Sequence, residues 1–125
     1  MNIMVVDDEQ DIQVLFKQKF RKEIRQKQIT FTFVFSAEEA LNCLQNTPND
    51  LILILADINM PGMNGLELLK IIKEKYAHLT VFMVTAYCDD KNYNTAIQYG
   101  ADDYLSKPIE FETLKQKMLE VLKVN

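Results

Sequence analysis

Leu51-Ile-Leu-Ile-Leu-Ala-Asp57 is the stretch that decides the fold, because six apolar residues in a row end on an acid. A strand covered by helices on both faces reads as a continuous apolar run of this kind. Ile3-Met-Val-Val6 has the same character and is followed by two acids, Asp7 and Asp8. The two runs predict buried parallel strands that each end on carboxylates.

Apolar runs and amphipathic stretches alternate along the chain without a repeat or a linker, which predicts one domain over residues 1–125. We expect strands at 3–6, 31–35, 51–56, 81–84 and 103–105, alternating with five helices. Ser36-Ala-Glu-Glu39 has capping-box spacing and predicts the start of the second helix. The expected apolar stripes are Ile12, Leu15, Phe16, Phe20 and Ile24 in the first helix, Ala37, Ala40, Leu41 and Leu44 in the second, and Tyr93, Ala96, Ile97 and Gly100 in the fourth.

The composition of the strands also predicts their order. Residues 30–35 alternate polar and apolar, and the strand at 103–105 is short and polar, so both belong at sheet edges. Right-handed crossovers then favour an α/β fold: a (βα)5 doubly wound, flavodoxin-like parallel sheet in the order 2-1-3-4-5. Ligands of such sheets bind at the carboxyl ends of the strands beside the switch point, where Asp7, Asp8 and Asp57 fall.

Bulk composition excludes several classes of protein. Of the 125 residues, 48% are hydrophobic and 26% charged, which is globular, and the net charge of −4 argues against direct binding to nucleic acid or to an anionic membrane. The apolar runs fall short of the roughly 20 residues that a membrane span needs, and no signal-peptide layout opens the chain. Two cysteines far apart in sequence favour free thiols in a reducing compartment, so we expect a cytoplasmic protein.

The three acids indicate a metal and phosphoryl site. Ionised carboxylates crowded at the mouth of an apolar sheet repel one another unless a cation lies among them or some hold protons. Magnesium suits them, because it takes oxygen ligands and is commonly held by one or two carboxylates and phosphate oxygens. Asp57 is the candidate nucleophile, and the turn after it brings a backbone carbonyl, that of Asn59, toward the metal. Lys107 and Thr85, at the same sheet edge, are candidate ligands of phosphoryl oxygens.

Simpler roles compete with these assignments. Asp7 and Asp8 could cap the first helix, which is a common use of aspartate. An isolated lysine such as Lys107 is most often a solvated surface residue, and Tyr104 on an edge strand is by default a half-exposed packing aromatic. The coincidence of three acids with a lysine at one sheet edge favours the functional interpretation for all but Tyr104.

Four motifs together resemble the receiver domain of bacterial two-component response regulators. The resemblance implies that a histidine kinase or histidine phosphotransfer protein phosphorylates Asp57. It implies that Asp8, Asp57 and the carbonyl of Asn59 bind Mg²⁺, that Asp7 acts largely through water, and that Thr85 and Lys107 bind the phosphoryl group. It also implies a cis bond between Lys107 and Pro108. The motifs are Val5-Val-Asp-Asp-Glu9, Ala56-Asp-Ile-Asn-Met-Pro-Gly-Met-Asn-Gly65, Val84-Thr-Ala86 and Gly100-Ala-Asp-Asp-Tyr-Leu-Ser-Lys-Pro108.

The same resemblance implies a readout and partners. Thr85 moves toward the phosphate, Tyr104 turns inward, and the face of the fourth helix, fifth strand and fifth helix changes shape. Asn59 and Tyr87 resemble positions that tune the loss of phosphate, and Tyr87 is expected to shield it. The expected partners are the kinase or phosphotransfer protein and a downstream target or tethered output domain, with a phosphorylation-dependent homodimer left open. Both a stand-alone receiver and a receiver that is part of a longer regulator are compatible with the sequence.

Three other classes of protein fit the sequence less well. A magnesium-dependent aspartyl-phosphate phosphatase of the haloacid-dehalogenase type carries a second aspartate two residues after its nucleophile, where this chain has Asn59, an amide that cannot exchange a proton. We therefore expect a signalling phosphoacceptor rather than an enzyme. No glycine-rich phosphate loop follows the first strand, which disfavours nucleotide binding. A phosphate-independent domain of receiver shape usually lacks an acid or the lysine, and neither is missing here.

Overall fold

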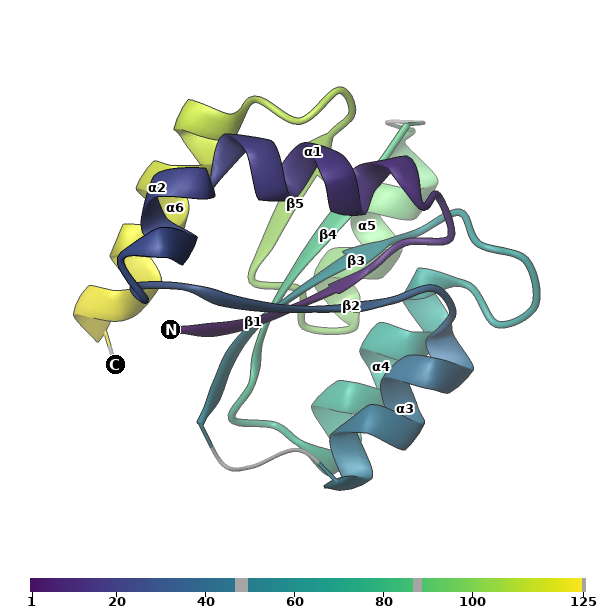
Figure 1. Cartoon of the computed structure of the whole chain (residues 1–125). Coiled ribbons are helices and arrows are strands. Elements are labelled where there is room, and N and C mark those ends of the chain that lie inside the picture. Colours follow the sequence, from purple (N-terminus) through teal and green to yellow (C-terminus); the bar gives the residue numbers. More distant parts are fainter. Residues whose placement is uncertain (47–49, 87–88, 125) are drawn as a thin grey trace.

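The computed structural model describes residues 1–46, 50–86 and 89–124, and a five-stranded sheet forms the centre of this part (Figure 1). Neighbouring strands are all parallel, and their order is β2-β1-β3-β4-β5. The predicted fold class and strand order are therefore confirmed. The strands are β1 (Asn2–Val6), β2 (Thr30–Val34), β3 (Leu51–Asp57), β4 (Thr80–Thr85) and β5 (Asp103–Ser106).

Helices cover both faces of the sheet. In Figure 1, α1 and α6 lie on one side, and α3 and α4 lie on the other, where α5 also packs. No helix within the described ranges is long and apolar enough to cross a membrane. The helices are α1 (Asp11–Lys19), α2 (Arg21–Arg25), α3 (Ala37–Asn46), α4 (Gly65–Lys75), α5 (Asp90–Gln98) and α6 (Phe111–Val124).

The first predicted helix is divided in two, so the helices expected as second to fifth are α3 to α6. The break lies at Phe20, where φ is −109° and ψ is 21°. No proline or glycine stands there; instead the Phe20 ring is fully buried and packs against Phe16, Phe31 and Phe111. Tertiary packing of one ring thus coincides with a change of helix direction that periodicity does not reveal.

Two apolar layers hold the fold together. One lies between the sheet and α3, α4 and α5, and the other lies between the sheet and α1 and α6. The apolar runs of β1 and β4 are buried, as are residues 53–57 of β3, whereas β2 alternates between exposed and partly buried residues as an edge strand should. The second layer holds most of the phenylalanine rings: Phe16, Phe20, Phe31, Phe33, Phe82 and Phe111.

The apolar stripe predicted for the fourth helix, now α5, is wrong in part. Ala96 is fully buried, but Tyr93 and Ile97 are 47% and 48% exposed. The small alanine side chain faces the core, while the Tyr93 ring packs edge-on against Tyr104 of β5, with ring centroids 5.3 Å apart. The stripe therefore lies partly on the molecular surface.

Side chains cap the helices near the site. The hydroxyl of Ser36 accepts a hydrogen bond from the N–H of Glu39 at 3.0 Å, and the Glu39 carboxylate accepts one from the N–H of Phe35 at 2.7 Å. The predicted capping residues are confirmed, although Glu39 reaches one residue further back than in the standard capping box. Asn64 and Asp89 cap α4 and α5 in the same way.

Candidate functional site

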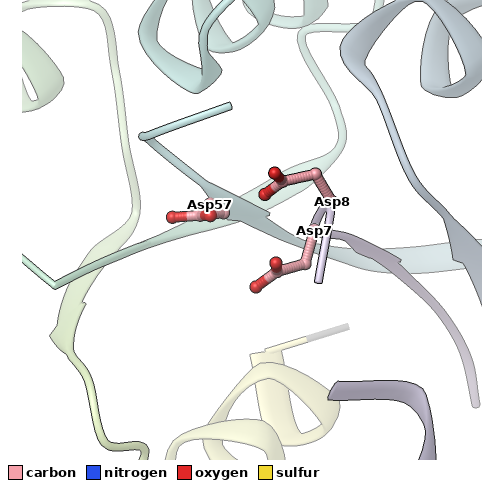
Figure 2. A group of neighbouring side chains, drawn as sticks. All are labelled: Asp7, Asp8 and Asp57. Atoms are coloured by element: carbon pink, nitrogen blue, oxygen red, sulfur yellow. The ribbon is translucent and has the colours of Figure 1, made fainter. Parts of the chain in front are cut away.

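The carboxyl ends of β1 and β3 bring three acids together, and Figure 2 shows the three side chains close to one another at these strand ends. Asp57 is the last residue of β3, and Asp7 and Asp8 directly follow β1. One carboxylate oxygen of each lies within 4.8 Å of the others. Asp7 and Asp57 are buried, whereas Asp8 is exposed. The cluster is therefore open to solvent on the Asp8 side.

Lys107 lies between the two buried acids. Its Nζ is 3.0 Å from Oδ2 of Asp7 and 3.4 Å from Oδ2 of Asp57. The backbone N–H of Lys107 donates to the carbonyl of Thr85 at 2.8 Å, which ties the end of β5 to the end of β4. The bond between Lys107 and Pro108 is cis, as the family resemblance implies. The lysine is thus a partly buried member of the site rather than a solvated surface residue.

Asn59 connects Asp57 to Thr85. Its backbone N–H donates to Oδ1 of Asp57 at 3.3 Å, and its side-chain amide donates to Oγ1 of Thr85 at 3.2 Å. Thr85 ends β4 and is fully buried. The loop after Asp57 therefore contacts the threonine through a side chain.

The turn after β3 is held close to the strand by Gly65, the first residue of α4. The N–H of Gly65 donates to the carbonyl of Ile58 at 2.9 Å. A Cβ atom on Gly65 would lie 2.1 Å from the carbonyl oxygen of Asp57, so only glycine fits without a backbone shift. The start of α4 thereby fixes the position of Asp57.

The electrostatics of the cluster favour an added cation. Burial first, and then the negative charge of Asp7, raise the pKa of Asp57 to about 6, against the opposing effects of Lys107 and the N–H of Asn59. Burial alone would lower the pKa of Lys107, but the contacts with Asp7, Asp57 and Glu9 outweigh it and raise the pKa above its usual value. One lysine charge does not neutralise three ionised acids.

The donor atoms suit a hard divalent cation. Every potential ligand in the cluster is a carboxylate oxygen, and magnesium, calcium and manganese prefer such oxygens, whereas zinc and copper sites usually contain nitrogen or sulfur. The exposed position of Asp8 leaves room for the waters that magnesium retains. The residues present therefore fit a divalent metal.

The remaining predicted site residues lie in different situations. Tyr104 of β5 packs against the core layer of α3, α4 and α5, and its hydroxyl is buried. Tyr87 lies outside the described residues, so its expected shielding role stays a prediction. Sequence reasoning missed Glu9, whose Oε1 is 3.6 Å from Nζ of Lys107, although it stands directly after the acid pair. It also missed the contact between Asn59 and Thr85, for which no sequence signal exists.

These features define a class of protein: a doubly wound parallel-sheet domain with an acid cluster and a lysine at its switch point. Residues 3–119 match the family model described as the response regulator receiver domain. The chain belongs to this family.

Relatives and solved structures agree with this assignment. The DNA-binding transcriptional regulator NtrC of Proteus hauseri is 39% identical over 111 residues, which cover 89% of this chain and 22% of that protein. The two-component response regulator ARR12 of Arabidopsis thaliana is 32% identical over 115 residues, 92% of this chain and 18% of that protein. This chain thus spans about a fifth of the length of these curated relatives.

Two structures show the likeness in three dimensions. A CheY-like receiver domain protein from Methanospirillum hungatei has a TM-score of 0.83 at 30% identity, covering 99% of this chain and 98% of that one. The response regulator TrrA from Thermotoga maritima, solved in complex with Mg²⁺-BeF, has a TM-score of 0.79 at 31% identity, covering 96% of this chain and 97% of that one.

Proposed function

We propose that this domain is a magnesium-dependent phosphoacceptor that takes a phosphoryl group onto Asp57 from a histidine kinase or a histidine phosphotransfer protein. The observation that carries the proposal is the approach of the Asp7, Asp8 and Asp57 carboxylates to within 4.8 Å, with Lys107 between two of them. A carboxylate oxygen of Asp57 attacks phosphorus, the bond from phosphorus to the imidazole nitrogen breaks, and the imidazole leaves.

Each residue then has a separate task. Asp8, Asp57 and the backbone carbonyl of Asn59 would hold Mg²⁺, with Asp7 acting through water. The metal, when bound, supplies positive charge that offsets the phosphoryl oxygens. Lys107 would bind an oxygen of a phosphoryl group on Asp57, because its Nζ already lies 3.4 Å from the carboxylate of that residue. Thr85 would donate its hydroxyl to another phosphoryl oxygen.

The proposed output is a change in the face formed by α5, β5 and α6. Thr85 must exchange its contact with the Asn59 amide for one with phosphate, and Tyr104 lies on the next strand, packed against Tyr93 of α5. The proposed change requires two packings of this face in equilibrium. Because phosphate adds only a few hydrogen bonds, the free energies of the two packings must differ by no more than a few kcal/mol. Asn59 and Tyr87 would tune how fast water removes the phosphate.

The domain is proposed to act in the cytoplasm as a signalling module over residues 1–125, without turnover of small phosphoesters. Its output would be a protein partner or a tethered domain. Relatives of which the chain matches only a part include a DNA-binding transcriptional regulator and a cyclic di-GMP phosphodiesterase. The Asn59 amide, where a haloacid-dehalogenase-like phosphatase has an acid, supports the signalling role.

Mass measurement after incubation with acetyl phosphate and Mg²⁺ tests the proposal. We expect one phosphoryl adduct on the wild type and none on Asp57→Asn, while Asp90→Asn, which changes an exposed acid of α5, should accept phosphate like the wild type. Chelation of the metal should abolish the adduct. An adduct on Asp57→Asn, or none on any of the three proteins, would refute the proposal.

A further inference from the structure

A groove of about 770 Å³ lies between α1 and α2 on one side and the edge strand β2 on the other. Figure 1 shows β2 below α1 and α2, with the chain running in the opposite direction to α1. Cations line it and, among the described residues that form its walls, no acid does. The four cations are Lys17, Arg21, Arg25 and Lys27.

This concentration of positive charge contrasts with the net charge of −4 of the whole chain. Within the described part of the chain, none of the four cations forms an ion pair with an acid. Glu23 of α2 pairs instead with Lys115 of α6 at 3.2 Å. Like charges gathered on one wall repel each other and attract an anionic partner. This attraction raises the association rate and the specificity of binding.

The other wall of the groove is an open sheet edge. Within the described residues, β2 pairs only with β1. The N–H of Thr30 donates to Met1, and the carbonyl of Val34 accepts from Asp7, so alternate residues face β1. The N–H and carbonyl groups of Phe31 and Phe33 therefore point away from the sheet. With no proline or charged residue in β2, this edge can accept another strand.

The spacing of two of these cations is close to that of side chains on one face of a strand. Lys17 of α1 and Arg21 and Arg25 of α2, which we call the cation ridge, recur every four residues in the sequence, and Arg21 and Arg25 lie about 6 Å apart along α2. Side chains on one face of an extended strand recur about every 6.8 Å. The rings of Phe31 and Phe33 pack against Phe16 of α1, so the α1 side of an added strand faces the ridge.

We propose that the β2 edge and the cation ridge bind an extended segment of a partner protein in which acidic side chains alternate with uncharged ones. The backbone of the segment would pair with Phe31 and Phe33, and every second side chain would meet a cation of the ridge. The uncharged side chains would lie on the opposite face, beside the exposed Thr30 and Thr32.

Labelled ten-residue peptides test the proposal by fluorescence anisotropy at low salt. One peptide alternates glutamate with valine, and a second has the same composition with all glutamates at one end. A third alternates lysine with valine, and a ten-nucleotide oligothymidine represents nucleic acid. We expect the alternating acidic peptide to bind most tightly and added salt to weaken it. Tighter binding of the block peptide or of the oligonucleotide would overturn the proposal.

Charge-matched variants separate the ridge from general electrostatics. Replacing Lys17, Arg21 and Arg25 together by Gln should weaken binding of the alternating peptide about tenfold or more. The control replaces three exposed lysines outside the groove by Gln and should lose at most about twofold. Equal losses in the two variants would contradict the proposal, provided that thermal unfolding shows both to be folded. The control positions are Lys70, Lys75 and Lys91.

Amide hydrogen exchange followed by NMR tests the strand pairing itself. The peptide should slow exchange at Phe31 and Phe33, whose N–H groups face outward, and leave the inward N–H of Thr32 little changed. Binding without added protection at Phe31 and Phe33 would refute strand addition. Because no groove residue belongs to the acid cluster, Asp57→Asn should bind the peptide like the wild type.

Discussion

Asn59 contacts both Asp57, the proposed phosphoacceptor, and Thr85, which is proposed to move when Asp57 is phosphorylated. Its backbone N–H donates to Asp57, and its side-chain amide donates to the hydroxyl of Thr85. Thr85 therefore has a defined partner before any phosphate arrives, and its proposed movement must break that hydrogen bond, whose net contribution is about 1 kcal/mol. This contact would give Asn59 a part in the proposed switch as well as in the proposed metal site.

Gly65→Ala should disturb the site from outside the acid cluster. The new Cβ would lie 2.1 Å from the carbonyl oxygen of Asp57. The backbone must move to relieve this clash. We expect a loss of unfolding free energy of about 2 kcal/mol or more, together with weaker Mg²⁺ binding, because Asp57 itself is displaced. Urea unfolding and isothermal titration calorimetry measure the two effects.

Gly100→Ala is the matched control for that substitution. Gly100 has φ of 95°, so alanine is strained there too, but the neighbouring atoms belong to the flexible Lys73 side chain. The control should lose stability without losing Mg²⁺ affinity. If Gly65→Ala bound Mg²⁺ as tightly as the wild type, the role given to Gly65 would be wrong.

At the scale of elements, the turn from α2 to β2 contains a backbone conformation that its residue does not favour. Lys27 has φ of 59°, in the left-handed region, where glycine is the usual residue after a helix. Lys27→Gly should raise the free energy of unfolding by about 0.5–1 kcal/mol, because it removes the Cβ strain. Lys27→Ala keeps that strain and should leave stability nearly unchanged, as urea unfolding will show. Equal stability of the Gly and Ala variants would contradict this account.

The elements were predictable to different degrees for physical reasons. Continuous apolar runs and one alternating run were enough to predict the strands and their order. A strand buried on both faces is apolar throughout, whereas a strand exposed on one face alternates polar and apolar residues. The break at Phe20 was not predictable, since it accompanies the packing of one ring against two partners distant in sequence, Phe31 and Phe111. The surface position of Tyr93 and Ile97 was missed because helical period alone does not say how wide the buried stripe is.

At the scale of the whole molecule, the acid cluster opposes the stability of the fold that positions it. The sequence predicted that Asp7, Asp8 and Asp57 form a cluster, because the topology of a parallel sheet brings the ends of their strands to the same edge. The contacts of Lys107, Asn59 and Glu9 depend on loop geometry, so sequence alone indicated the lysine only by its position after the last strand. Burying Asp57 beside Asp7 costs free energy whenever both are ionised and no metal is bound.

Stability should therefore depend on pH in the metal-free protein. The pKa of Asp57 rises from 3.8 to about 6 on folding, so the folded state keeps a proton that the unfolded state has released between these values. Stability from this group is then lost as pH rises from about 4 to about 6, by up to roughly 3 kcal/mol. In chelator, Asp57→Asn should unfold at higher urea concentration than the wild type at pH 7, and the difference should shrink toward pH 4. Saturating Mg²⁺ should stabilise the wild type more than Asp57→Asn. A difference between the two proteins that did not change with pH would show that Asp57 does not bear this charge cost.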